Sequence, residues 1–343
     1  MTARRSHVSR GRVAAFLAVL LLATTLAASG CGSDGGSATP SDVRSVTLGV
    51  SQESMSGLAY VARDKGLFAS NGLDLEFVEY SSSQLAYEAL LSGEVDAALC
   101  ADTPIVLGAL DNERVMIIAT VATDMNDIQI VARADAGIAT PKDLEGMRIG
   151  TREGTAAHFF LHSFLIKNGM TEDDVSVQFD AFESVTRSLI DGRLDAVSLR
   201  EPFIAQLSEA LGDDFVVFEE HGLYAKTMNL CVSAGDAAPD ADVQRRLIRS
   251  LLDAEAAGVA QGVENTRIEI AEAIGISPEG LCVCIISEGA VGLDQSLLLT
   301  FEDQARWART SGVARHDRDV DFLELINTSV LDEIAPERVT VVR

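Results

Sequence analysis

Lysine, and positive charge in general, is scarce in this chain. Its 343 residues include 27 basic side chains against 52 acidic ones, and only four of the basic residues are lysines. A protein with a formal net charge of −25 repels the phosphate backbone, so we expect no nucleic-acid partner. The preference for arginine over lysine is typical both of a salty habitat and of a GC-rich genome, and composition does not separate the two.

Cysteines are also few, and their spacing fits neither a disulfide framework nor a zinc site. Beyond Cys31 the chain contains Cys100, Cys231, Cys282 and Cys284. The last two stand one residue apart within an apolar run. This pattern predicts thiols packed in the core rather than metal ligands.

The sequence contains no P-loop, nucleophile elbow or metal-hydrolase motif. Cys100 and Asp102, with His158, could form a nucleophile and base, which makes an enzyme the rival class. His158 and His162 would share one helix face, but no third metal ligand follows at a suitable spacing. We therefore predict no catalytic residue, no cofactor, no metal, and two partly buried histidines.

The first thirty residues have the pattern of a targeting segment. Four arginines precede an apolar run over 13–28 that is shorter than the about 20 residues of a membrane span. The following LAASGC resembles the lipobox of bacterial lipoproteins, in which the signal is removed before a cysteine that carries lipid. We predict a lipoprotein signal peptide over 1–30, lipidation of Cys31, and a flexible linker over 31–43. An uncleaved anchor helix is the alternative.

The stretch 147–157, MRIGTREGTAA, has the pattern of a strand, a polar turn and the start of a helix. Such a helix begins with backbone N–H groups that lack partners and with the positive end of its dipole, so it can receive an anion. Arg152 would add a positive charge. The alternative is a simple cap, and we expect Thr151 or Thr155 to cap the helix.

The strand and helix patterns repeat along the chain. Strands are predicted over 46–50, 73–78, 95–100, 148–150, 175–179 and 194–199. Helices are predicted over 58–68, 84–92, 158–168 and 184–191, and from 241 onward, including 268–274, 297–309 and 321–330. The phrase SGEVDAAL at 92–99 returns as DGRLDAVSL at 191–199. Two β-α-β-α-β segments predict two parallel-rich α/β lobes.

About 300 residues follow the signal, which is long for one core and indicates two domains. We expect lobe 1 over 44–124, lobe 2 over 125–228, and a return to lobe 1 over 229–343. The C-terminal helices would pack on the first lobe. Apolar runs at 115–121 and 128–132 could carry the chain across to the second lobe.

Five phrases, in this order, resemble the substrate-binding proteins of ABC importers in the nitrate/sulfonate/taurine group, which includes thiamine-pyrimidine binders. They are AYVARDKGLFASNGLDLEFVEY, ALLSGEVDAAL, DLEGMRIGTREGT, LIDGRLDAVSLREPF and GVARHDRDVDFLELINTSVL. The resemblance spans nearly the whole mature chain. It implies a type II periplasmic-binding-protein fold with two α/β lobes, a two-strand hinge and a ligand cleft. It also implies that the lobes close on the ligand and dock on a membrane permease.

The resemblance also implies ligand contacts after the strand ends, where open α/β sheets bind their ligands. In the first lobe the matching positions are Ser51, Gln52, Met55, Ser82, Ser83, Cys100, Asp102 and Thr103. In the second they are Thr151, Gly154, Thr155, Ala156, Arg200 and Glu201, with Thr123 and Asn229 near the crossings.

Arg152 and Arg200 follow two strand ends of the same predicted lobe, and a parallel sheet would bring them to one rim. Their guanidinium groups match the oxygens of carboxylate, sulfonate or nitrate. The alternative is a solvated rim of mixed charge with Glu153 and Glu201.

The expected protein is a lipid-anchored, extracytoplasmic and monomeric binding protein that delivers an organic or inorganic anion, such as a sulfonate or nitrate, to an ABC permease. A neutral or zwitterionic heterocycle, such as a thiamine-pyrimidine precursor, is the alternative ligand. The alternative classes are a biosynthetic enzyme on the same fold and a sensor without a permease. Cleavage and lipidation of the signal would favour the binding protein over the enzyme.

Overall fold

The computed structural model describes residues 43–278, 281, 289–316 and 318–342. The predictions of a signal peptide, of lipidation at Cys31, of a linker up to residue 42 and of buried thiols at Cys282 and Cys284 lie outside these residues. None of the described helices is both long enough and apolar enough to cross a membrane.

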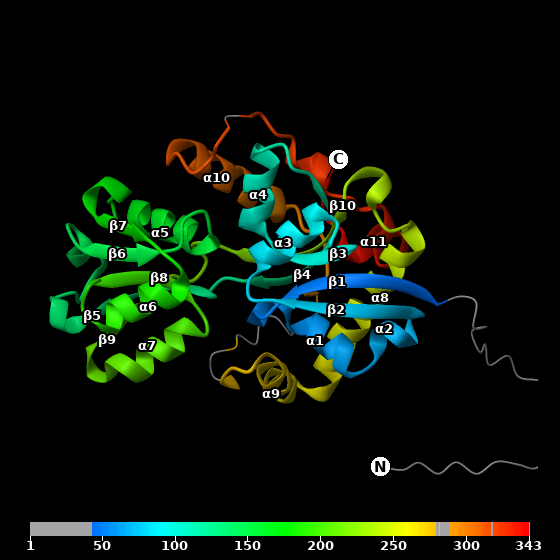
Figure 1. Cartoon of the computed structure of the whole chain (residues 1–343), viewed down its shortest axis with the longest axis horizontal. Helices are drawn as coiled ribbons and strands as arrows, with labels where there is room; N and C mark the ends of the chain where they lie inside the picture. The colour runs from blue at the N-terminus through cyan, green and yellow to red at the C-terminus, as the bar shows by residue number, and fades with distance from the viewer. Residues whose placement is uncertain (1–42, 279–280, 282–288, 317, 343) are drawn as a thin grey trace, which may run out of the picture. The chain divides into compact units, whose positions relative to one another are not determined.

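The first sheet has five strands in the order β2-β1-β3-β10-β4 (Figure 1). Strand β1 pairs in parallel with β2 and β3, whereas β10 pairs antiparallel with β3 and β4. The strands are β1 (Arg44–Ser51), β2 (Leu73–Tyr80), β3 (Ala97–Ala101), β4 (Val115–Asp124) and β10 (Lys226–Ser233). The helices that connect the parallel strands are α1 (Gly57–Asp64), α2 (Leu67–Ser70) and α3 (Ser83–Ser92), and α4 (Asp102–Leu110) follows β3.

The second sheet repeats this design in the order β7-β6-β8-β5-β9. Here β6 pairs in parallel with β7 and β8, and β5 pairs antiparallel with β8 and β9. Its strands are β5 (Ile128–Arg133), β6 (Arg148–Thr151), β7 (Ser176–Phe179), β8 (Ala196–Arg200) and β9 (Phe215–Phe218), and its helices are α5 (Ala156–Lys167), α6 (Phe182–Ile190) and α7 (Phe203–Leu211). The predicted pair of parallel-rich α/β lobes is confirmed, with antiparallel strands added to each sheet.

The C-terminal third of the chain supplies α8 (Ala241–Gln261), α9 (Val263–Ile274), α10 (Ser296–Thr310) and α11 (Ser329–Ile334). Helix α8 packs against α1 and α2 of the first lobe, as expected (Figure 1). Helix α10 packs against α4 and also reaches α5 of the second lobe. The C-terminal region therefore contacts both lobes.

Two helix predictions are wrong in detail. The predicted helix over 58–68 is interrupted at Gly66, whose φ of 66° is left-handed. The predicted helix over 321–330 is instead a 3-10 turn, Phe322–Leu325, followed by α11. The chain leaves the helical path because Asn327 donates its backbone N–H to the Ile117 carbonyl of β4 at 2.8 Å.

Gly150 lies in β6, where two neighbouring elements approach its backbone closely. A Cβ at this position would lie 2.4 Å from Leu194 Cδ1 and 3.1 Å from Val185 Cβ. Glycine therefore allows α6 and the segment before β8 to pack on β6.

We expect Gly150→Ala to lower the free energy of unfolding by about 1–3 kcal/mol, because the methyl group overpacks this site. Urea unfolding measures the change. In a Leu194→Ala background the same substitution should cost less, since the shortened side chain frees the space. A Gly150→Ala protein as stable as the wild type would contradict this packing.

Candidate ligand-binding site

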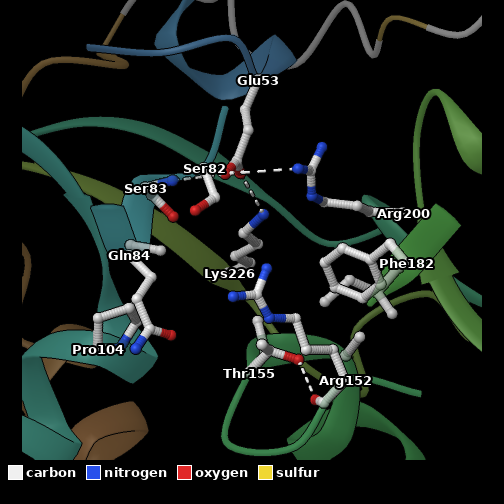
Figure 2. A pocket seen from close by; sticks show the side chains of 14 residues that line it. Glu53, Ser82, Ser83, Gln84, Pro104, Arg152, Thr155, Phe182, Arg200 and Lys226 are labelled. Atoms are coloured by element: carbon white, nitrogen blue, oxygen red, sulfur yellow. Dashed lines mark hydrogen bonds and ion pairs between the residues drawn. The ribbon is translucent and has the colours of Figure 1, made fainter. Parts of the chain in front are cut away.

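A pocket that is partly open to solvent lies where the strand ends of the two sheets meet (Figure 2). Its walls come from the segments that follow β1, β2 and β3 in the first lobe and β6, β7 and β8 in the second. The first residues of β5 and β10 complete it. The lining residues are Glu53, Ser82, Ser83, Gln84, Ala101, Pro104, Ile128, Arg152, Thr155, Ala156, Ala157, Phe182, Arg200 and Lys226.

Six of the residues proposed from the sequence line this pocket. They are Ser82, Ser83, Arg152, Thr155, Ala156 and Arg200. All six follow strands whose carboxyl ends were expected to face the cleft. Ligand contact at these positions stays a prediction.

The other proposed residues do not line the pocket. Thr151 donates its hydroxyl to the Ser198 carbonyl at 3.1 Å, and Asn229 is held between Thr120 and Thr227. The side chains of Ser51, Met55, Cys100, Asp102 and Thr103 are also buried in the fold, while Gln52 and Thr123 are exposed and Glu201 is partly buried. Gly154 lines a neighbouring groove.

Glu53 and Lys226 are the charged lining residues that the sequence analysis did not propose. Glu53 lies in the loop after β1, between the predicted residues Gln52 and Met55. Lys226 is one of only four lysines and opens the buried strand KTMNLCVS. A lone lysine at the start of a buried strand is the signal that could have found it.

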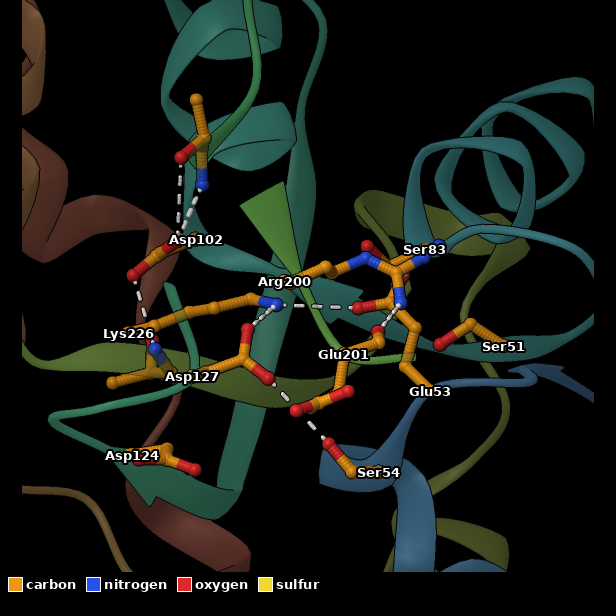
Figure 3. A network of polar contacts seen from close by, with 12 residues as sticks. Ser51, Glu53, Ser54, Ser83, Asp102, Asp124, Asp127, Arg200, Glu201 and Lys226 are labelled. Carbon is orange, nitrogen blue, oxygen red and sulfur yellow. Dashed lines mark hydrogen bonds and ion pairs between the residues drawn. The ribbon is translucent and has the colours of Figure 1, made fainter. Parts of the chain in front are cut away.

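Four buried charges form a cluster beside the pocket (Figure 3). Lys226 Nζ lies 2.7 Å from Asp127 Oδ2 and 3.2 Å from Glu53 Oε2. Arg200 NH2 lies 3.7 Å from Glu53 Oε1, which is an ion pair beyond hydrogen-bond distance. Two cations and two carboxylates therefore balance one another, as buried charges require.

Glu53 is 4% exposed and is held by groups from three elements. The backbone N–H of Ser83, at the start of α3, donates to Glu53 Oε1 at 2.9 Å. Burial alone would raise the pKa of Glu53, but the charges of Arg200 and Lys226 outweigh it and lower that pKa to about 2. The pKa of Lys226 is raised by Asp127 and Glu53 against the opposing effect of burial. Both residues are thus charged at neutral pH.

Arg200 belongs to the buried wall rather than to a solvated rim. Its NH1 donates to the Glu201 carbonyl at 2.7 Å, and its Cζ lies 5.6 Å from the centre of the Phe182 ring. The guanidinium group is thus held by Glu53, a carbonyl and an aromatic face. The rim alternative does not hold for Arg200, because the side chain is buried.

Arg152 differs from the two cations of the cluster. Its side chain lines the pocket and points toward Lys226 and Arg200 in Figure 2. Within the part of the chain that the structure describes, its guanidinium group has no ion-pair partner. The pocket therefore contains one positive charge that no carboxylate of the described residues compensates.

The start of α5 adds backbone donors to the same wall. Thr155 occupies the N-cap position, but its hydroxyl donates to the Arg152 carbonyl at 2.7 Å and caps no backbone N–H. The expectation that Thr151 or Thr155 caps the helix is thus wrong, because both hydroxyls donate to carbonyls. Ala156 and Ala157, which begin the helix, line the pocket. The first N–H groups of a helix lack intrahelical partners, which favours an anion here.

The residues of the rival enzyme hypothesis lie away from the pocket. Cys100 is fully buried in β3. Asp102 accepts hydrogen bonds from the Tyr224 hydroxyl at 2.6 Å and from the Thr227 N–H at 3.0 Å. The carboxylate therefore ties α4 to β10, and a ligand in the pocket would reach neither side chain.

His158 and His162 both contact the carboxylate of Glu172. Their ring nitrogens lie 3.2 and 3.1 Å from the two oxygens of Glu172. His158 also packs edge-on against Trp307 of α10. Burial opposes ionisation of Glu172, but the hydrogen bonds from both histidines outweigh it and lower the pKa to about 2. Among the described residues no group of three or more possible ligands is placed to hold a metal ion.

Two α/β lobes with a pocket between their strand ends define the type II periplasmic-binding-protein fold. Residues 54–265 match the protein family described as NMT1/THI5 like. This match covers more than half of the 343 residues, so the chain belongs to the NMT1/THI5-like family.

Curated relatives with similar sequences are named as binding proteins. A putative aliphatic sulfonates-binding protein of Bacillus subtilis is 24% identical over 191 residues, covering 54% of this chain and 57% of that protein. The chain spans about half the length of the curated relatives it matches. The names agree with the prediction of a binding protein rather than an enzyme.

Solved structures support the fold. The periplasmic aliphatic sulphonate binding protein SsuA of Escherichia coli has a TM-score of 0.69 at 14% identity, over 83% of this chain and 92% of that one. The alkanesulfonate-binding protein SsuA of Xanthomonas axonopodis pv. citri, bound to MOPS, has a TM-score of 0.69 at 15% identity, over 84% and 99%. At this identity the likeness shows the fold alone.

Asp124, at the end of β4, is the basis of a pH prediction. Burial, with the nearby charge of Asp127, raises its pKa to about 6 from the ordinary value of 3.8. A carboxyl whose pKa is raised by folding stabilises the protein at low pH, and this stability is lost as the pH rises through 6. We expect Asp124→Asn to stabilise the protein by up to about 3 kcal/mol at pH 8 and hardly at all at pH 4.

Denaturant unfolding at both pH values measures this difference. The exposed Asp173→Asn serves as the control variant. The same effect of Asp124→Asn at pH 4 and pH 8 would contradict the assignment.

Proposed function

We propose that this chain is an extracytoplasmic solute-binding protein that captures a small organic anion, such as a sulfonate, and delivers it to the permease of an ABC importer. The observation that carries the proposal is the guanidinium group of Arg152. It points into the pocket without an ion-pair partner among the described residues, while Arg200 and Lys226 are compensated by Glu53 and Asp127.

Backbone donors support the same ligand charge. Helix α5 begins at Ala156 and Ala157, which line the pocket, and no threonine hydroxyl caps its first N–H groups. Ser82 and Ser83 line the pocket from the first lobe, opposite α5. A tetrahedral or planar anion would thus meet a guanidinium fork and neutral donors together.

The apolar part of the wall supports an organic ligand. Pro104, Ile128 and Phe182 line the pocket beside the polar groups. A sulfonate with an alkyl or aromatic body would cover this surface, whereas nitrate would leave it exposed. The names of the relatives, which bind aliphatic sulphonates or alkanesulfonates, agree with this choice.

Contacts from both lobes give the ligand its effect on conformation. Arg152 belongs to the second lobe, while Ser82 and Ser83 belong to the first. A ligand that touches both sides binds the closed arrangement more tightly and shifts the population toward it. In the proposed cycle the permease recognises this closed form.

A thermal-shift screen tests the ligand class, because a ligand that binds only the folded state raises the melting temperature. We expect ethanesulfonate and related sulfonates to raise it. If sulfonates, nitrate and carboxylates leave it unchanged while a pyrimidine raises it, the alternative heterocycle ligand replaces the anion.

For a sulfonate that raises the melting temperature, we expect Arg152→Gln to weaken binding by about 2 kcal/mol or more. The substitution removes the charge that pairs with the ligand. Isothermal titration calorimetry measures the loss. The matched control is Arg148→Gln at the start of β6, the strand that precedes Arg152; Arg148 pairs with Asp195 at 2.6 Å outside the pocket. Equal affinities of the two variants would contradict the proposed role of Arg152.

Lipid anchoring through Cys31 is a separate part of the proposal and rests on the resemblance of LAASGC to a lipobox. In a bacterial host we expect the wild type in the membrane fraction, labelled by a fatty-acid probe. Cys31→Ala should abolish the label and release the protein from the membrane or leave its signal uncleaved. Labelling that persists in Cys31→Ala would contradict lipidation at this cysteine.

A further inference from the structure

We propose that Glu53 sets the charge of the ligand: as a fixed counter-ion of Arg200 and Lys226, it leaves one uncompensated cation in the pocket and selects monoanions over dianions. The inference rests on the proposed function, since it concerns the same pocket. In this proposal, the buried residue Glu53 discriminates between ligands that have the same shape but different charges.

The position of Glu53 supports a permanent role in the wall. Ser83 N–H donates to Oε1 at 2.9 Å, Lys226 Nζ lies 3.2 Å from Oε2, and Arg200 NH2 lies 3.7 Å from Oε1. Both oxygens are engaged, and the side chain is buried. The carboxylate is therefore part of the folded site rather than a mobile group that a ligand displaces.

The charges along the pocket wall follow from this position. Glu53, Arg152, Arg200 and Lys226 are the charged lining residues. Asp127 lies outside the pocket lining and compensates Lys226 from behind, at 2.7 Å. Glu53 faces the pocket between the two cations (Figures 2 and 3). A ligand thus meets the carboxylate of Glu53, which is already paired with the two cations that a second negative charge on the ligand would need.

A single negative charge on the ligand pairs with Arg152. A second negative charge would have no free cation and would face the carboxylate of Glu53 in a partly desolvated space, where repulsion is stronger than in water. Removing the charge of Glu53 would leave Arg200 without its counter-ion and free toward the ligand, while Asp127 still compensates Lys226. Selectivity should then move toward the dianion.

Methanesulfonate and sulfate are suitable probes, because both are tetrahedral with similar size and they differ by one charge. Calorimetry on the full chain gives the ratio of the two affinities for each variant. We expect the wild type to bind methanesulfonate at least about tenfold more tightly than sulfate, and Glu53→Gln to shift this ratio toward sulfate by about tenfold or more.

Asp127→Asn is the matched control. It removes the same charge from a carboxylate that contacts the same lysine, but at a position outside the pocket lining. We expect it to change the affinity ratio by less than about threefold. A shift of equal size in both variants would overturn the specific role of Glu53, because net charge alone would then explain selectivity.

A second variant covers the case in which Glu53→Gln does not fold. The double variant Glu53→Gln with Lys226→Met removes one charge of each sign and still leaves Arg200 without its counter-ion. It should also shift the ratio toward sulfate by about tenfold.

The outcomes separate this inference from the proposed function. A folded variant whose ratio equals that of the wild type, or a wild type that prefers sulfate, would overturn the inference and leave anion binding intact. A wild type that binds neither these anions nor larger sulfonates would overturn the proposed function and the inference together.

Discussion

The ion pairs of Lys226 with Glu53 and Asp127 are the interaction on which the centre of this molecule depends. A buried ammonium group costs several kcal/mol unless carboxylates compensate it. The three residues come from the start of β10, the loop after β1 and the segment between β4 and β5. The ammonium group of Lys226 therefore connects the two segments that cross between the sheets, before β5 and at the start of β10, to the loop after β1 in the first lobe. Arg200 extends the cluster to the second lobe.

This arrangement divides the cations near the pocket into two kinds. Arg200 and Lys226 have protein counter-ions and hold the walls in place. Arg152 has none among the described residues and lies beside the uncapped start of α5. The charges that hold the walls are thus separate from the charge that we propose to bind the ligand. The acidic surface of the chain has little influence there because salt screens it over about 10 Å.

Local sequence patterns predicted the fold well and the site in part. The repeat of SGEVDAAL as DGRLDAVSL indicated two equivalent lobes, and the strand ends led to Ser82, Arg152 and Arg200 in the pocket wall. The sequence did not predict Glu53 and Lys226 as site residues. They are buried because they pair with each other across 173 positions, and a contact over that separation leaves no periodic pattern in the local sequence. The expected threonine cap failed for two reasons: the hydroxyl of Thr151 donates to the distant Ser198 carbonyl, and that of Thr155, at the N-cap, donates to the nearby Arg152 carbonyl.

A crystal structure of the protein with a bound alkanesulfonate tests the central claim most directly. The account predicts sulfonate oxygens within hydrogen-bond distance of Arg152 and of the first N–H groups of α5, with Glu53 still between Lys226 and Arg200. A sulfonate that displaces Glu53 and binds Arg200 and Lys226 directly would contradict the separation of structural and ligand-binding charges. So would a ligand that leaves Arg152 without a contact.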